Sequence, residues 1–198
     1  MDFLNNYYNT YSSPYYVDAP IFGVGNDTYD PYDYYQYPYG INIQAFNPIP
    51  VTNQYGNQIL MTDYGPAPFS VNIEQAAKQN SNFRTALWTG DHLQLTLMSL
   101  NVGQDIGLEI HPDLDQFLRI EQGQGLAMMG DSMDRMDFQA NVEDGYIIII
   151  PAGKWHNLIN TGNTPLKLYS IYAPPQHPHG TVHVTRADAE AAERNNLH

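Results

Sequence analysis

Two short stretches decide the fold of this chain: residues 107–125, GLEIHPDLDQFLRIEQGQG, and residues 145–160, GYIIIIPAGKWHNLIN. Each contains apolar runs that are interrupted by Gly, Pro or Asp, which is typical of short strands joined by tight turns. Each also contains one histidine, His111 or His156, and His111 is flanked by carboxylates. The two stretches therefore indicate β-structure that could carry a metal site.

The same pattern continues on both sides of these stretches. Nine short apolar or alternating runs lie between residues 83 and 172, which predicts an all-β sandwich or barrel. A short helix is predicted near residues 72–80, with Asn72 as its N-cap. A second helix is predicted near residues 187–194, behind Thr185 and Asp188 as a capping box.

Ten residues in and around the two stretches keep a regular spacing. The second stretch has the pattern G-x5-P-x-G-x2-H-x3-N, formed by Gly145, Pro151, Gly153, His156 and Asn160. The first has the pattern G-x5-E-x-H-x4-Q-x6-G, formed by Gly103, Glu109, His111, Gln116 and Gly123. These patterns resemble the two conserved motifs of the cupin superfamily. The second matches throughout, whereas the first has Glu109 in place of a His and Gln116 in place of a Glu.

The resemblance covers roughly residues 68–185 and implies the antiparallel double-stranded β-helix, or jelly-roll barrel, of single-domain cupins, with short flanking helices. The 21 residues between the two motifs suit one hairpin. We expect three parts: a Tyr-, Asn-, Pro- and Gly-rich N-terminal arm at 1–65, a cupin domain at 66–185, and a short C-terminal helix and tail at 186–198.

The motif spacing also has a physical reason. Glu109 and His111 are two apart on a strand, so their side chains share a face, and Gln116 is expected on the hairpin partner of that strand. His156 is expected to face these three from the opposite sheet. Two imidazoles, one carboxylate and one amide oxygen suit one divalent ion, Mn, Fe, Zn or Ni. We therefore predict Glu109, His111, Gln116 and His156 as metal ligands.

The resemblance leaves a metal-free alternative open. These donor types match in kind those of mannose-6-phosphate isomerases, which are zinc cupins, but the sugar epimerases of the superfamily work without metal. In the alternative, Glu109 and Gln116 bond neighbouring backbone. A carboxylate is costly to bury without a counter-charge, which favours a metal.

Other polar residues give weaker signals. Lys154 shares strand parity with His156 and is a candidate substrate contact, with a solvated lysine as the alternative. For His177, His179 and His183, which follow the last predicted strand, a surface loop is favoured over a ligand cluster. Because only Arg119 and Lys154 lie near the motifs, a sugar phosphate is a poor substrate for this site.

Charge and composition limit the partners. The chain has 21 Asp and Glu against eight Lys and Arg, and its net charge of −13 repels nucleic acid and anionic lipid surfaces. It has no cysteine, so neither a disulfide nor a thiolate ligand can form. The longest aliphatic run, at 147–150, is far shorter than the roughly 20 residues of a membrane span. We expect synthesis in the cytoplasm without a signal peptide, and no nucleic-acid or membrane partner.

Residues 1–65 differ from the rest of the chain. They hold 13 of the 16 tyrosines and no Lys or Arg. Such a biased segment does not form a core of its own, although its tyrosines carry much buriable area. It is either a disordered tail or an arm that packs on a neighbouring subunit. The second alternative predicts a homo-oligomer or a larger assembly, and the composition resembles bacterial coat and surface-layer proteins, including spore coats.

Two classes of function follow. The first is a metal-dependent isomerase or dioxygenase that acts on a sugar or another small carbonyl compound. The second is a structural protein of the spore-coat or surface-filament type, in which the barrel is a building block and the arm joins subunits. A module that binds a small molecule without turnover lies between them.

Overall fold

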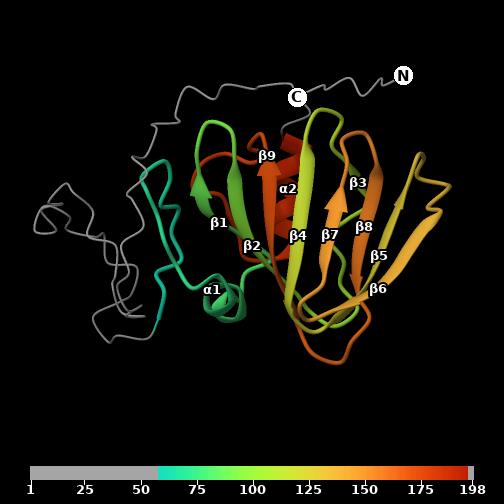
Figure 1. Cartoon of the computed structure of the whole chain (residues 1–198), viewed down its shortest axis with the longest axis horizontal. Coiled ribbons are helices and arrows are strands. Elements are labelled where there is room, and N and C mark those ends of the chain that lie inside the picture. The colour runs from blue at the N-terminus through green and yellow to red at the C-terminus, as the bar shows by residue number, and fades with distance from the viewer. Residues whose placement is uncertain (1–57, 196–198) are drawn as a thin grey trace, which may run out of the picture. The chain divides into compact units, whose positions relative to one another are not determined.

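The computed structural model describes residues 58–195 of the chain, so most of the predicted Tyr-rich arm lies outside the described residues. Residues 58–195 form two facing antiparallel sheets with one short helix at each end of the segment (Figure 1). The predicted all-β jelly-roll fold is confirmed.

The larger sheet has six strands in the order β10-β1-β2-β9-β4-β7. Every neighbouring pair in it is antiparallel. Its strands are β1 (Arg84–Thr89), β2 (Gln94–Leu100), β4 (Asp115–Gln122), β7 (Ile147–Ile150), β9 (Leu166–Ala173) and β10 (Val182–His183). The smaller sheet has the order β3-β8-β5-β6, with β3 (Glu109–Ile110), β5 (Gln124–Gly130), β6 (Phe138–Glu143) and β8 (Trp155–Asn160).

The interior between the sheets divides into an apolar and a polar region. The apolar region includes fully buried side chains from both sheets, such as Leu118, Leu158 and Leu168. The polar region begins with a row of buried side chains that are directly opposed across β2, β9 and β4: Gln94, Tyr172 and Gln116. Since buried polar groups need partners, this row marks the place to look for a functional site.

The opposite face of the six-stranded sheet is covered by helix α1 (Ile73–Gln79). Its predicted N-cap is confirmed, because Asn72 Oδ1 accepts a hydrogen bond of 3.0 Å from the backbone N–H of Gln75. Two of its alanines are fully buried against Leu87 and Leu97 of the sheet.

Residues just before position 66 pack with the barrel domain. Ile59 and Tyr64 are only 4% and 7% exposed to solvent, and both belong to the buried cluster under α1. Asp63, between them, accepts hydrogen bonds from Gly65, Thr89 and Gly180. The folded unit therefore includes residues that composition alone assigned to the Tyr-rich segment.

All four motif glycines take a positive φ that other residues rarely adopt: Gly103, Gly123, Gly145 and Gly153. Gly145 and Gly153 have φ values of 85° and 77°, in the turns before β7 and β8. Asn160 at the end of the second motif donates hydrogen bonds to the carbonyls of Leu100 and Thr164, each of 2.9 Å. Gly145, Gly153 and Asn160 therefore build the barrel and carry no chemistry.

The C-terminal part contains one expected and one unexpected element. Helix α2 (Arg186–Asn195) has the predicted capping box, in which Thr185 and Asp188 each accept a hydrogen bond from the other's backbone N–H. Strand β10 was not predicted, because two residues are too few to show an alternating pattern. Over residues 58–195, neither helix is long and apolar enough to cross a membrane.

Candidate metal centre

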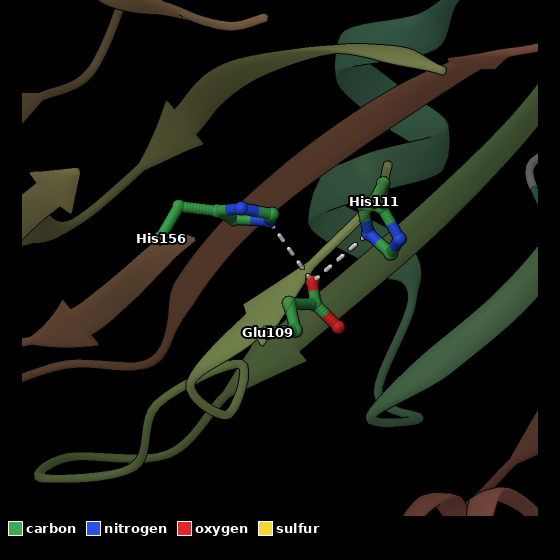
Figure 2. A group of neighbouring side chains, drawn as sticks. All are labelled: Glu109, His111 and His156. Carbon is green, nitrogen blue, oxygen red and sulfur yellow. Dashed lines mark ion pairs between the residues drawn. The ribbon is translucent and has the colours of Figure 1, made fainter. Parts of the chain in front are cut away.

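Three predicted ligands meet inside the barrel, at the pairing of β3 with β8. Glu109 and His156 are directly opposed in that pairing, and His111 follows β3 by one residue. Figure 2 shows both imidazole rings directed at one oxygen of the Glu109 carboxylate. Glu109 Oε1 lies 3.3 Å from His156 Nε2 and 3.6 Å from His111 Nε2.

The three facing atoms have no hydrogen-bond partner. Glu109 Oε1, His111 Nε2 and His156 Nε2 are all buried and unsatisfied. Within residues 58–195 this oxygen of Glu109 therefore makes none of the backbone hydrogen bonds that the metal-free alternative expected. A buried, unpartnered set of one carboxylate and two imidazoles is costly unless something binds it.

The tautomer of His156 strengthens this argument. Its Nδ1 lies 3.0 Å from the carbonyl oxygen of Lys154 and donates to it, so in the neutral ring the lone pair is on Nε2, which faces the Glu109 oxygen. Two electron-rich atoms at that distance repel one another unless a cation or a proton lies between them. A backbone carbonyl that orients an imidazole in this way is the usual support of a metal-bound histidine.

The spacing of the donor atoms fits a small divalent ion. All three atoms lie within 4.8 Å of one another. Ligands at roughly 2.0 to 2.2 Å from one ion, at tetrahedral or octahedral angles, are about 2.8 to 3.6 Å apart. The two measured separations from Glu109 lie at the upper end of that range, so the three side chains need only small adjustments to hold an ion.

The electrostatics keep Glu109 ionised. Burial alone would raise the pKa of its carboxyl, but the nearby imidazoles of His111 and His156 and the charge of Arg84 together hold that pKa well below its usual value. The carboxylate is thus in the charge state that a metal ligand requires.

Gln116, the fourth predicted ligand, comes from the other sheet. The sequence placed it on the hairpin partner of β3 with His156 opposite. Instead, β3 pairs with β8, and Gln116 lies on β4 of the six-stranded sheet. That arrangement was wrong, because residues 111–114 cross between the sheets and do not form a hairpin turn. The Gln116 amide donates to Ser170 Oγ at 3.0 Å, which leaves its buried carbonyl oxygen unpartnered.

Lys154, the candidate substrate contact, lies just before β8 at the surface. Its Nζ pairs with Asp131, and its side chain is 42% exposed. The ammonium group is therefore directed to an exposed carboxylate and not to the three converging donors.

Three polar residues next to these donors were not identified from the sequence. The ring of Tyr172 contacts those of His111 and His177, at centroid distances of 5.7 Å and 5.2 Å. Arg84 is fully buried in the same region. Burial and, next, the charge of Arg84 lower the pKa of His177 to about 3. His177 lies in a loop after β9, as predicted, but it is only partly exposed, whereas His179 is exposed. No local pattern marked these residues, because their positions depend on strands that are distant in sequence.

Comparisons with known proteins agree with this architecture. The family described as cupin domain matches residues 96–172, which include the three converging donors. An uncharacterized protein of Bacillus subtilis strain 168, YrkC, is 56% identical over 191 residues, which are 94% of this chain and 99% of that protein. An uncharacterized protein of Acanthamoeba polyphaga mimivirus is 44% identical over 119 residues, which are 60% of this chain and 72% of that protein.

A solved structure shows the same similarity. The crystal structure of BH2720 from Bacillus halodurans has 69% sequence identity to this chain and a TM-score of 0.65, and the match covers 66% of this chain and 98% of that one. The two motifs, the double-stranded β-helix and these matches lead to one conclusion: this chain belongs to the cupin superfamily.

Proposed function

We propose that the protein is a metal-dependent cupin enzyme that binds one divalent ion, Mn, Fe, Zn or Ni, through Glu109, His111 and His156, with Gln116 as a neutral fourth donor. One observation carries this proposal: three buried donor atoms face one another without any hydrogen-bond partner. The set of two imidazoles and one carboxylate suits first-row divalent ions and leaves coordination positions open.

A bound ion would supply Lewis acidity, which polarises a carbonyl group or stabilises an enediolate. The chain's own residues would orient the ligands. The Lys154 carbonyl fixes the His156 ring, and Ser170 holds the Gln116 amide with its oxygen free. Isomerase and dioxygenase chemistry on a small carbonyl compound both suit such a site.

Metal content tests this proposal. Protein purified without a tag should contain close to one equivalent of a divalent metal by elemental analysis, and His156→Ala should reduce that content at least tenfold. His92→Ala is the matched control, since His92 is exposed in the turn before β2. Two results would reject the site. One is wild-type protein that remains metal-free after incubation with each of the four ions, and the other is a metal content in His156→Ala equal to that of the wild type.

We also propose a second role, in which copies of the chain associate into an assembly of the spore-coat or surface-filament type. The supporting observation is an apolar groove of about 570 Å³ that includes none of the three metal donors. It runs along β7, an edge strand of the six-stranded sheet, and β6, an edge strand of the four-stranded sheet. Exposed apolar side chains on one protein surface favour contact with another: Phe138, Tyr146, Ile147 and Ile149.

A further inference from the structure

Arg84 is a buried cation that lies over the ring of Phe83, 5.6 Å from its centroid, and whose charge reaches Glu109 only at longer range. It is 1% exposed, and its Nε and Nη1 atoms are buried without a hydrogen-bond partner. Within residues 58–195 no carboxylate lies in ion-pair contact with it. Leaving a guanidinium unpaired in the interior costs several kcal/mol by the usual estimates, so a site of this kind is expected to have a ligand of opposite charge.

The fold directs Arg84 into the barrel. Arg84 on β1 is directly opposite Met98 on β2, and Met98 belongs to the core between the two sheets. Residues opposite one another on antiparallel strands share a face. The guanidinium therefore belongs to the same interior as the metal centre.

A cavity leads to Arg84 from outside. It has a volume of about 390 Å³ and is lined by Arg84, His177, Thr181, His183 and Glu193, among others. Gln94 fixes the position of His177, because its side chain accepts from the His177 backbone N–H at 2.9 Å and donates to the His177 carbonyl at 2.8 Å. Hydrogen bonds thus hold the His177 part of the lining in place.

A continuous series of ring contacts connects this cavity with the metal centre. His177 contacts Tyr172, Tyr172 contacts His111, and His111 contacts His156, with centroid distances of 5.2, 5.7 and 5.3 Å. The Tyr172 hydroxyl and His177 Nε2 are also buried without partners. Side-chain contacts therefore run from His177, in the lining of the Arg84 cavity, to the histidines of the metal centre.

We propose that Arg84 binds the carboxylate of the substrate, so the enzyme acts on small carboxylic acids whose other end reaches the metal centre. This inference rests on the proposed function. A divalent ion, Arg84, Glu109 and the cavity residue Glu193 together carry a net charge of +1, which an anionic substrate offsets and a neutral sugar does not. The planar guanidinium matches a carboxylate in shape and hydrogen-bonding pattern. A phosphate would need further cationic donors, and Arg84 is the only cation among the described residues that line the cavity.

Binding of simple acids to metal-loaded protein tests the proposal. Acetate, pyruvate and malonate, measured by calorimetry, should bind more tightly than acetamide. Arg84→Met should raise the dissociation constants about 10- to 100-fold, the effect of losing one or two charge-assisted hydrogen bonds. Arg84→Lys should give an intermediate value and keeps the test possible if Arg84→Met does not fold. Arg135→Met is the matched control, since Arg135 is 62% exposed and pairs only with exposed carboxylates.

Metal analysis of the same samples separates this inference from the proposed function. Acid binding that is equal in wild type and Arg84→Met, with unchanged metal content, overturns the role of Arg84 and leaves the metal site intact. Loss of acid binding in Arg84→Met but not in Arg135→Met, with metal retained, supports it. Tighter binding of inorganic phosphate than of any carboxylate overturns the carboxylate assignment. Absence of metal from every sample contradicts the proposed function alone, and the Arg84 comparison then still decides the inference.

Discussion

At the scale of single residues, a bound metal would engage the Nε2 atoms of His111 and His156, which have no hydrogen-bond partner within residues 58–195. An ion that binds only the folded state, at 100 times its dissociation constant, adds about 2.7 kcal/mol to the free energy of unfolding. At roughly 2 to 4 °C per kcal/mol, a chelator should lower the melting temperature by about 5 to 11 °C. Differential scanning calorimetry with and without chelator measures this shift.

Substitutions assign the shift to particular side chains. His111→Ala or His156→Ala should abolish the effect of the chelator. Gln116→Ala should reduce it least, since a neutral amide is the poorest donor of the four. The His92→Ala control should keep the full shift. A chelator shift that persists in both histidine variants would place the metal elsewhere in the protein.

The residues of the site differ in how far sequence could predict them. Spacing within one strand placed Glu109 beside His111, and the same motif logic found His156. Arg84, Tyr172 and His177 gave no such signal, because a buried arginine or an interior histidine looks like a surface residue until the strands around it are known. A local sequence pattern thus predicts the metal donors that lie within or next to one strand. It does not predict the polar residues that distant strands bring to the same site.

At the scale of elements, Asp63 joins three segments of the chain. Its carboxylate accepts hydrogen bonds from Gly65 N at 3.0 Å, from Thr89 Oγ1 at 2.6 Å and from Gly180 N at 2.9 Å. Asp63→Ala should lower the free energy of unfolding by about 2 to 4 kcal/mol, because it leaves these donors without a partner. Urea denaturation at pH 7 measures the loss, and Asp91→Ala, at an exposed turn position, should change it by less than about 0.5 kcal/mol.

The same carboxylate predicts a pH dependence. Burial by itself would raise the pKa of Asp63, but its hydrogen bonds and the nearby His179 lower it below the value of the unfolded chain. A group whose pKa falls on folding stabilises the protein fully above the unfolded pKa, about 4, and loses that contribution as the pH falls through the folded pKa. The stability difference between wild type and Asp63→Ala should therefore shrink below about pH 4. A constant difference down to pH 2 would contradict this role.

Element boundaries were predicted better than element pairing. The nine runs of the sequence correspond to β1–β9, and both helices lie where their caps predicted them. The partner of β3 was wrong because side-chain parity holds along one strand, whereas the choice of neighbouring strand depends on the whole sheet. The prediction put Gln116 in the same sheet as Glu109 and His156 in the opposite sheet. In the structure the two are exchanged: His156 lies in the sheet of Glu109, and Gln116 lies in the six-stranded sheet.

At the scale of the whole molecule, the composition change near residue 65 falls among packed residues, because Ile59 and Tyr64 are buried. Removing residues 1–57 should leave the barrel folded, because residues 58–195 form both sheets and the two buried clusters. Removing residues 1–65 should cost roughly 3 to 6 kcal/mol more, since it deletes the buried Ile59 and Tyr64 together with Asp63. Circular dichroism melts of the two truncated proteins distinguish these cases. Equal melting temperatures would mean that residues 58–65 add nothing to the domain.

The shorter truncation also tests how copies of the chain associate. If tyrosines of the N-terminal segment join subunits, removal of residues 1–57 should reduce the molar mass measured by light scattering while the melting temperature is preserved. If the apolar groove is the contact, Ile149→Lys should have that effect instead, because it places a charge among side chains that would become buried. Val184→Lys is the control, since Val184 is exposed but lies outside the groove. A molar mass that neither the truncation nor Ile149→Lys changes would remove both interfaces, and with them the proposal that the cupin serves as a building block.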